Sequence, residues 1–231
     1  MPHKLYWQPI LDKLLPAICL LCRQSGVAAS LCDGCIADLP RLGAACPICA
    51  SAVADATVPC GRCQRRRPPY EQLIAPLDYA FPVDRLLRRI KFQRELALVE
   101  PLATVLLAAV ARAEINCDIV VPVPLHWRRL LWRGFNQAQC LAEPLAAALM
   151  LPLHARALLR TRATHAQSAL PRTVRRRNVV GAFAARADRV AGQRCLLVDD
   201  VVTSGTTIAA AADALLQAGA ESVTAACVAR A

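Results

Sequence analysis

Two adjacent carboxylates and a turn of small hydroxyl side chains stand together toward the end of the printed sequence. The acidic pair, Asp199 and Asp200, directly follows the apolar run Cys195 to Val198. The hydroxyl turn comes next and leads into an apolar helical pattern; it comprises Thr203, Ser204, Gly205, Thr206 and Thr207. Backbone N–H groups at a helix start can bind a phosphate, and two carboxylates can accept hydrogen bonds from vicinal hydroxyls, directly or through Mg²⁺. The segment predicts a ribose 5-phosphate site, against the alternative of an ordinary Asp turn and Thr helix cap.

A basic segment follows an earlier Val-rich run, Asp118 to Val123, and could bind a second anionic group. Arginine forks suit phosphate oxygens in bidentate geometry, and Gly134 lets a ligand approach the backbone closely. The candidate pyrophosphate ligands are Arg128, Arg129 and Arg133. A solvated basic turn explains the same residues equally well. His126 in this segment is more typical of a surface or capping histidine than of a catalytic base.

Eight of the twelve cysteines form four Cys-x-x-Cys pairs, separated by nine, ten and ten residues. Each pair can give two thiolates to a tetrahedral Zn²⁺, so the pattern predicts two structural Cys₄ sites. The ligands would be Cys19, Cys22, Cys32, Cys35, Cys46, Cys49, Cys60 and Cys63. Sequential pairing, which we prefer, makes two successive ribbons, and interleaved pairing makes one cross-braced module. The remaining cysteines lie in apolar stretches and are predicted core residues: Cys117, Cys140, Cys195 and Cys227.

The composition limits the class of protein. The chain has 231 residues, of which 56% are hydrophobic, enough to bury a core. Its net charge is +11, with only three lysines among 28 basic residues, which favours anionic partners, although genome bias produces the same composition. The apolar stretch from Leu14 to Leu21 makes a poor secretory signal, and we find no run as long as a membrane helix. We therefore expect a cytoplasmic protein with reduced thiols.

The elements that must position these residues divide into a Cys-rich module over 1–67 and an α/β domain over 68–231, with the boundary at Pro68-Pro69. The patterns predict strands at 73–79, 118–123, 153–158, 182–183, 195–198 and 222–228. They predict helices at 83–89, 96–113, 136–150, 173–180 and 207–218, a mobile loop at 160–172 and a turn at 199–206. Asn136 is the expected N-cap of the helix at 136–150. The final strand–helix–strand order indicates a parallel sheet with a right-handed crossover.

The segment from Leu196 to Thr207 resembles the phosphoribosyl pyrophosphate (PRPP) motif of type I phosphoribosyltransferases. A wider set of motifs resembles the ComF family, which includes the GntX-like proteins. These motifs are Val120 to Arg129, Arg133 to Gln137, Gln167 with Leu170, Arg175 to Asn178, Lys91-Phe92 and the four Cys pairs. The resemblance implies a type I phosphoribosyltransferase-like parallel sheet flanked by helices and preceded by a double zinc ribbon. It also implies PRPP with Mg²⁺ as ligand, and a link to DNA uptake and natural transformation.

By this resemblance, the acidic pair would hold the ribose hydroxyls and the hydroxyl turn would hold the 5-phosphate. The segment Thr164 to Asn178 would be a flexible loop that closes over the donor, with Gln167, Arg175 and Arg176 as its candidate site residues.

Two functions fit these motifs best. The first is Mg²⁺-dependent phosphoribosyl transfer with release of pyrophosphate, in which Asp199 and Asp200 would be the catalytic residues. The alternative is a non-catalytic PRPP-sensing adaptor that contacts DNA or uptake proteins. Arg62 and the run Arg65 to Arg67 would suit a DNA backbone. A zinc adaptor with a vestigial site is a third option, and the complete motif argues against it.

Overall fold

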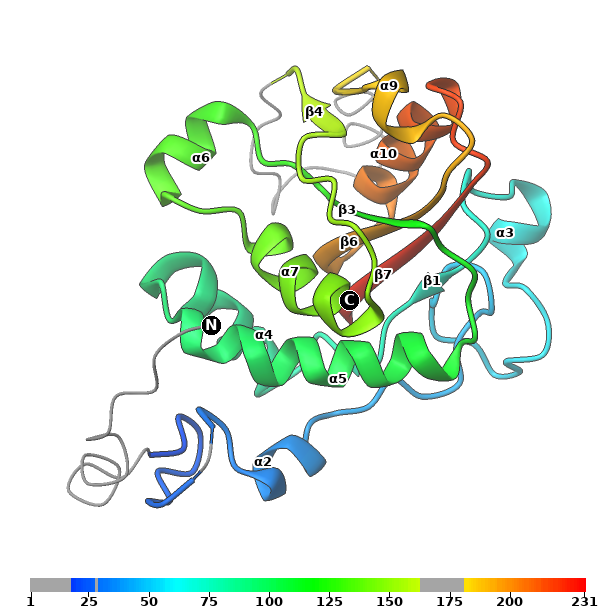
Figure 1. Ribbon diagram of the computed structural model, residues 1–231. Helices are drawn as coiled ribbons and strands as arrows, with labels where there is room; N and C mark the ends of the chain where they lie inside the picture. The colour runs from blue at the N-terminus through cyan, green and yellow to red at the C-terminus, as the bar shows by residue number, and fades with distance from the viewer. Residues whose placement is uncertain (1–17, 28, 163–180) are drawn as a thin grey trace.

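The computed structural model describes residues 18–27, 29–162 and 181–231, and a parallel sheet lies at its centre (Figure 1). The strand order is β1-β7-β6-β3, and β2 also pairs with β7. All of these pairs run parallel. The bounds are Leu73–Ile74 (β1), Leu77–Asp78 (β2), Ile119–Pro122 (β3), Arg194–Val202 (β6) and Ser222–Arg230 (β7). A separate antiparallel pair joins β4, Leu158–Arg160, to β5, Phe183–Ala185.

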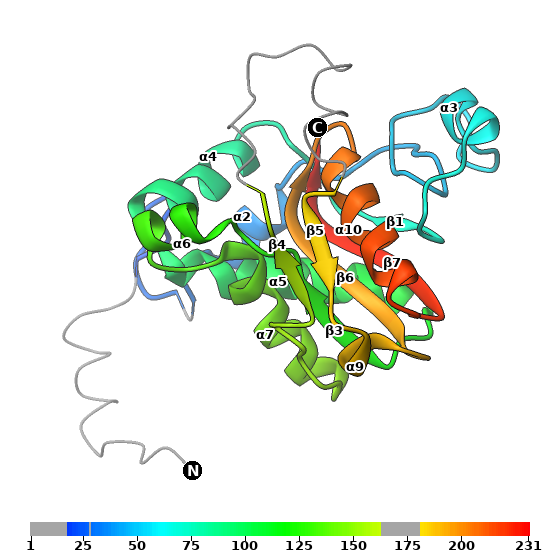
Figure 2. The same cartoon turned by 90° about the horizontal axis from the view of Figure 1, so that it is seen from above.

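Helices cover both faces of the sheet (Figure 2). Alternate residues of β6 enter two different cores: Leu196 and Val198 pack with α5 and α7, whereas Cys195 and Leu197 pack with α10. Both faces are apolar because a parallel sheet is buried on both sides. The helices are α4 Val83–Arg88, π-helix η1 Arg89–Gln93, 3₁₀-helix η2 Leu96–Leu98, α5 Val99–Arg112, α6 Trp127–Arg133, α7 Gln137–Leu149, α9 Ala187–Val190 and α10 Thr206–Gln217. Among the described residues, every helix is too short or too polar to cross a membrane.

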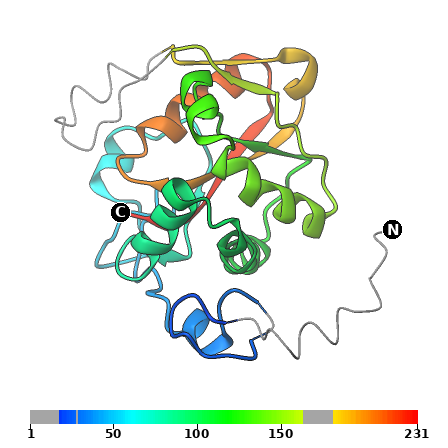
Figure 3. The same ribbon diagram turned by 90° about the vertical axis from the view of Figure 1, so that its left-hand side faces the viewer.

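The Cys-rich segment is divided between the two faces of the sheet. The first ribbon, Cys19 to Cys35, ends within α2 (Asp33–Ala37), and its Cys19 and Leu31 belong to the core on the α5 face. The second ribbon, Cys46 to Cys63, ends within α3 (Gly61–Arg65) and packs into the α10 face. Figure 3 shows the first ribbon as a unit below the helices, away from the second. The two ribbons therefore support opposite layers of one fold.

The segment between the ribbons runs along the outer side of β2. Arg41 forms an antiparallel bridge with Leu77. On either side of this bridge, Leu42 N–H donates to the carbonyl of Pro76 (2.9 Å), and Asp78 N–H donates to the carbonyl of Pro40 (3.0 Å). The Cys-rich segment is thus hydrogen-bonded to the sheet. The division into domains at residue 67/68 stays a prediction.

Several local expectations are corrected. The strand expected at 73–79 is broken into β1 and β2 around Pro76, which has no N–H to donate. The strand expected at 153–158 lies instead at 158–160, and only Leu153 makes a bridge, to Val120. Helix α6 replaces the expected basic loop, and β6 continues to Val202, so the acidic pair lies in a strand rather than a turn. The helix expected at 173–180 and residues 163–172 of the expected loop fall outside the described residues.

Other local expectations are confirmed. Asn136 caps α7, because its side-chain oxygen accepts from Ala138 N–H at 3.2 Å. His126 is a capping histidine, since its Nδ1 accepts from Arg128 N–H at the start of α6 (3.3 Å). Cys195 and Cys227 are fully buried in the core, and Cys117 and Cys140 are half-buried at its margin.

Candidate functional site

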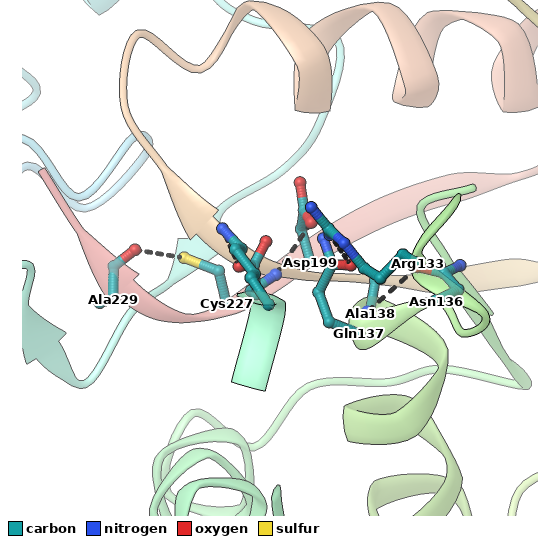
Figure 4. Close-up of polar contacts among 9 residues, drawn as sticks. Arg133, Asn136, Gln137, Ala138, Asp199, Cys227 and Ala229 are labelled. Atoms are coloured by element: carbon teal, nitrogen blue, oxygen red, sulfur yellow. Dashed lines mark hydrogen bonds and ion pairs between the residues drawn. The ribbon is translucent and has the colours of Figure 1, made fainter. Parts of the chain in front are cut away.

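The acidic pair lies near the carboxyl end of β6, in the middle of the sheet (Figure 1). Asp199 is in register with Cys227 of β7, and its Oδ1 accepts from Asp200 N–H at 2.9 Å. Figure 4 shows Arg133 and Gln137 on one side of Asp199 and Cys227 on the other. Asp200 is buried, with 4% exposure. A buried carboxylate needs a compensating charge, and the structure supplies one.

Lys91 is that compensating charge. Its Nζ forms an ion pair with Asp200 Oδ2, and it projects from the π-helix η1. Burial alone would raise the pKa of Asp200, but the attraction of Lys91 and its hydrogen bond outweigh burial and lower that pKa. The partner Asp199 behaves in the opposite way, because burial and the neighbouring Asp200 charge raise its pKa. One carboxylate of the pair is therefore held charged, and the other takes up a proton more readily.

Arginines gather beside the acidic pair. Arg133 is half-buried, its Nη1 donates to Gln137 Oε1 at 2.5 Å, and its guanidinium lies 5.7 Å from the centre of the Phe92 ring. Burial and the positive charge of Arg129 lower the pKa of Arg133, while Asp200 acts in the other direction. Burial and Arg129 likewise lower the pKa of Arg160, which Asp199 attracts. These mutual effects show excess positive charge at this edge of the sheet.

The three arginines predicted to bind pyrophosphate lie in different environments. Arg133 interacts with the charge of Asp200, and Arg129 lies close enough to Arg133 and Arg160 to lower their pKa values. Arg128 instead is exposed, with its guanidinium 5.3 Å from the centre of the Trp127 ring. The candidates Gln167, Arg175 and Arg176 fall outside the described residues.

The hydroxyl turn links β6 to α10. Gly205 has φ +76°, a left-handed conformation that favours glycine, and α10 begins at the next residue. The hydroxyls of Ser204 and Thr206 lie 2.8 Å apart, and Thr206 N–H donates to Ser204 Oγ at 3.4 Å. This short connection places hydroxyl groups and the N-terminus of a twelve-residue helix beside the acidic pair, which is an arrangement suited to an anion.

Two arginines attach the hydroxyl turn to the second ribbon. Arg62 Nη1 donates to the carbonyl of Ser204 at 3.1 Å. Arg230, at 6% exposure, donates to the carbonyls of Val202 (3.0 Å) and Thr203 on one side. On the other side, Arg230 donates to atoms of the second ribbon, the carbonyl of Cys49 (3.2 Å) and the hydroxyl of Ser51 (2.8 Å). The conformation of the turn therefore depends on that ribbon.

The eight predicted thiols form two separate quartets. In each quartet the four Sγ atoms lie within 4.8 Å of one another, and the members are Cys19, Cys22, Cys32 and Cys35, then Cys46, Cys49, Cys60 and Cys63. Sequential pairing is therefore confirmed.

The geometry of each quartet fits zinc. Tetrahedral zinc with Zn–S bonds of about 2.3 Å requires sulfurs roughly 3.8 Å apart. Cys22 and Cys32 are separated by 3.6 Å, and Cys49 and Cys60 by 3.7 Å. Burial opposes ionisation of Cys19, but backbone N–H donors outweigh it and lower the pKa of that thiol to about 6. The chain thus has two Cys₄ zinc-binding sites.

Sequence reasoning gave no role at this site to Lys91, Arg160 or Arg230. Lys91 was marked only as part of the Lys91-Phe92 motif, without a role, and in the structure it projects from the π-helix to pair with Asp200. Arg160 and Arg230 are two of many arginines, so their residue type gives no signal. A usable signal for Arg230 was its position within an apolar strand, where a charged residue requires partners.

Comparisons with known proteins agree with this geometry. Residues 140–231 match the phosphoribosyl transferase domain family, and residues 10–64 match the double zinc ribbon domain family. The chain is 36% identical over 224 residues to the DNA utilization protein YhgH of Escherichia coli (strain K12), covering 94% of this chain and 98% of the relative. It is 30% identical over 214 residues to competence protein F of Haemophilus influenzae, covering 89% and 93%.

A glutamine PRPP amidotransferase from B. subtilis shares 24% identity over 55% of this chain and 25% of that one, at a TM-score of 0.38, which adds nothing to the assignment. The two curated relatives match most of the length of the chain. The chain therefore belongs to the family of ComF- and YhgH-like proteins, which join a double zinc ribbon to a phosphoribosyltransferase-type domain.

Proposed function

We propose that the protein binds PRPP at the carboxyl edge of its sheet and transfers the phosphoribosyl group to a nucleophile, releasing pyrophosphate. One observation carries this proposal. The acidic pair is followed in the chain by the hydroxyl turn and helix α10. Lys91, Arg133 and Arg160 interact with the pair, and Arg129 lies near the two arginines. A ligand with a diol between two phosphorylated ends has the matching order of groups.

In this proposal the hydroxyl turn binds the 5-phosphate through backbone N–H groups and hydroxyls. The acidic pair accepts hydrogen bonds from the ribose hydroxyls. Arg129 and Arg133 bind the pyrophosphate oxygens. Gln167, Arg175 and Arg176 are proposed to cover the bound donor, and Arg128 to meet it at the rim.

The chemistry proposed for this site depends on charge. The bond between C1 of the ribose and the pyrophosphate oxygen breaks, and its electron pair leaves with the pyrophosphate. The basic cluster stabilises the negative charge that develops on the leaving group. The Asp200 carboxylate faces the positive charge that develops on the sugar. The nucleophile then supplies the electron pair of the new bond to C1.

Mg²⁺ suits this site as an ion that arrives with the donor. It is usually held by one or two carboxylates together with substrate phosphates, and the acidic pair offers two adjacent carboxylates. When bound, the ion would neutralise phosphate charge and make pyrophosphate a better leaving group. Lys91 already neutralises Asp200, so the protein's own residues compensate the buried charge without it.

The biological setting is proposed from the relatives, which are named for DNA utilization and for competence. We place this protein in the same process, in the cytoplasm, with DNA or DNA-uptake proteins as partners. A PRPP-sensing adaptor is the second candidate function. Arg62 and Arg230 connect the hydroxyl turn to the second ribbon, and this connection favours the sensing function. Ligand binding at the turn would change the contacts of these arginines and so affect the ribbon.

Calorimetric titration of PRPP into the zinc-loaded protein, with and without Mg²⁺, tests the proposal. Asp199→Asn combined with Asp200→Asn should weaken binding by about a hundredfold, as expected for the loss of buried charged partners, without changing the zinc content. Asp188→Asn is the matched control, since Asp188 pairs with arginines on the surface. Unaltered PRPP binding in the double variant would contradict the site. Release of pyrophosphate in the presence of an acceptor would distinguish phosphoribosyl transfer from PRPP sensing without catalysis.

A further inference from the structure

A cavity of about 710 Å³ lies between α10, β5 and the end of the second ribbon. The helix α3 lies on the α10 side of the sheet (Figure 2). The cavity runs along α10 from Thr206 to Gln217, a length of roughly 16 Å at the rise of an α-helix. Cavities of this volume are typical of sites for small organic ligands.

This cavity is distinct from the proposed donor site. Its lining includes neither carboxylate of the acidic pair, nor Lys91, Arg129 or Arg133. The two sites share only the hydroxyl turn, where Ser204, Gly205 and Thr206 contribute to the lining. The other lining residues of α10 lie further along the helix, away from the acidic pair.

The lining contributed by the end of the second ribbon and the residues after it is strongly basic. It includes Arg62, Arg66 and Arg67, which are exposed. Arg62 already donates to the carbonyl of Ser204, which leaves Arg66 and Arg67 to meet a ligand. Two guanidinium groups in one lining are suited to phosphate oxygens.

The lining also has an apolar part. Pro68 and Pro69 contribute to it, together with the alanines of α10, including Ala210. These small or rigid side chains leave space for a flat ring. Toward the C-terminal end of α10, Gln217 Nε2 donates to Asp213 Oδ2 at 2.9 Å, and this pair presents acceptor oxygens suited to ring N–H groups.

We propose that this cavity binds a nucleoside phosphate. Its phosphates would contact Arg66 and Arg67, its base would lie against the prolines and the alanines of α10, and the base edge would reach Asp213 and Gln217. The lining combines cationic, apolar and hydrogen-bonding groups, which match the phosphate, the face and the edge of such a ligand. This site adds to the donor site and does not depend on PRPP being the donor.

Calorimetric titration of ADP into the zinc-loaded full-length chain tests the proposal. We expect saturable binding that Arg66→Glu or Arg67→Glu weakens by about tenfold each, since each removes a charge-assisted contact. Arg65→Glu is the matched control. It changes the same charge in the same segment, but Arg65 does not line the cavity. Ala210→Phe, which fills the apolar part of the lining, should abolish binding while far-UV circular dichroism and zinc content stay unchanged.

Three results would overturn this site. The first is the absence of saturable ADP binding to the wild-type chain. The second is an equal loss of affinity in Arg65→Glu and Arg66→Glu, which would mean that only net charge matters. The third is loss of ADP binding in the Asp199→Asn, Asp200→Asn variant, which would place the nucleotide in the donor site instead. Unchanged ADP binding in that variant supports a separate site, whatever the outcome for PRPP.

Discussion

Replacing Arg230 by methionine should weaken the connection between the second ribbon and the hydroxyl turn. Methionine keeps an unbranched apolar stem but removes every donor from a side chain that is 6% exposed. The carbonyls of Cys49 and Thr203 would lose a charged donor, whereas that of Val202 keeps the N–H of Ala231. At about 1–3 kcal/mol for each buried acceptor left without its donor, we expect a loss of roughly 3 kcal/mol.

Differential scanning calorimetry of the zinc-loaded chain measures this loss. For a chain of this size, each kcal/mol shifts Tm by about 2–4 °C, so we expect Arg230→Met to lower Tm by roughly 6–12 °C. Arg186→Met is the control, because Arg186 makes only a surface ion pair with Asp188. Arg230→Lys should be intermediate, since a lysine keeps the charge but not the fork geometry. A Tm of Arg230→Met equal to that of the control would refute the reasoning.

The remaining predictions concern two ion pairs, Lys91 with Asp200 and Arg194 with Asp118. Lys91→Met leaves Asp200 buried without a counter-charge, which should cost about 3–5 kcal/mol at pH 7. Because burial then raises the pKa of Asp200, urea midpoints of the variant should rise more steeply from pH 7 toward pH 5 than those of wild type, in which Lys91 keeps Asp200 charged and only Asp199 of the pair has a raised pKa. Arg194 holds the pKa of Asp118 at about 2. The pair therefore stabilises the folded state fully at pH values above the ordinary pKa of an aspartate, and this stabilisation is lost as the pH falls from there toward 2. NMR titration of Asp118 should show this pKa, and Arg194→Gln should raise it.

The sequence was most informative where chemistry is local. The acidic pair and the hydroxyl turn occupy consecutive positions, so one strand and one helix start are enough to bring them together. Each cysteine pair likewise needs only a tight turn, which explains why both quartets could be predicted from spacing. The residue expectations that depended on capping, at Asn136 and His126, held for the same reason.

The rest of the site depends on contacts between distant segments. Lys91 meets Asp200 across more than a hundred residues, and Arg230 meets Cys49 across 181. No period or motif within either segment specifies such a partner. The extension of β6 through the acidic pair was missed because adjacent carboxylates are rare in strands, and here Lys91 and Gln137 make their burial tolerable. Helix α6 was missed because its apolar residues are exposed, so no buried stripe marks it.

The segment Pro40 to Leu42 has a consequence for how the protein avoids aggregation. A strand at the border of a sheet presents unpaired N–H and carbonyl groups, which can template pairing with another chain. Here the Arg41 bridge and its two flanking hydrogen bonds cover β2 on that side. This cover is anchored by a zinc ribbon at each end, since Cys35 precedes it and Cys46 follows it. The zinc sites thus hold in place the segment that covers the edge strand β2. We expect a chain deprived of zinc to expose this edge and to pair through it with other chains.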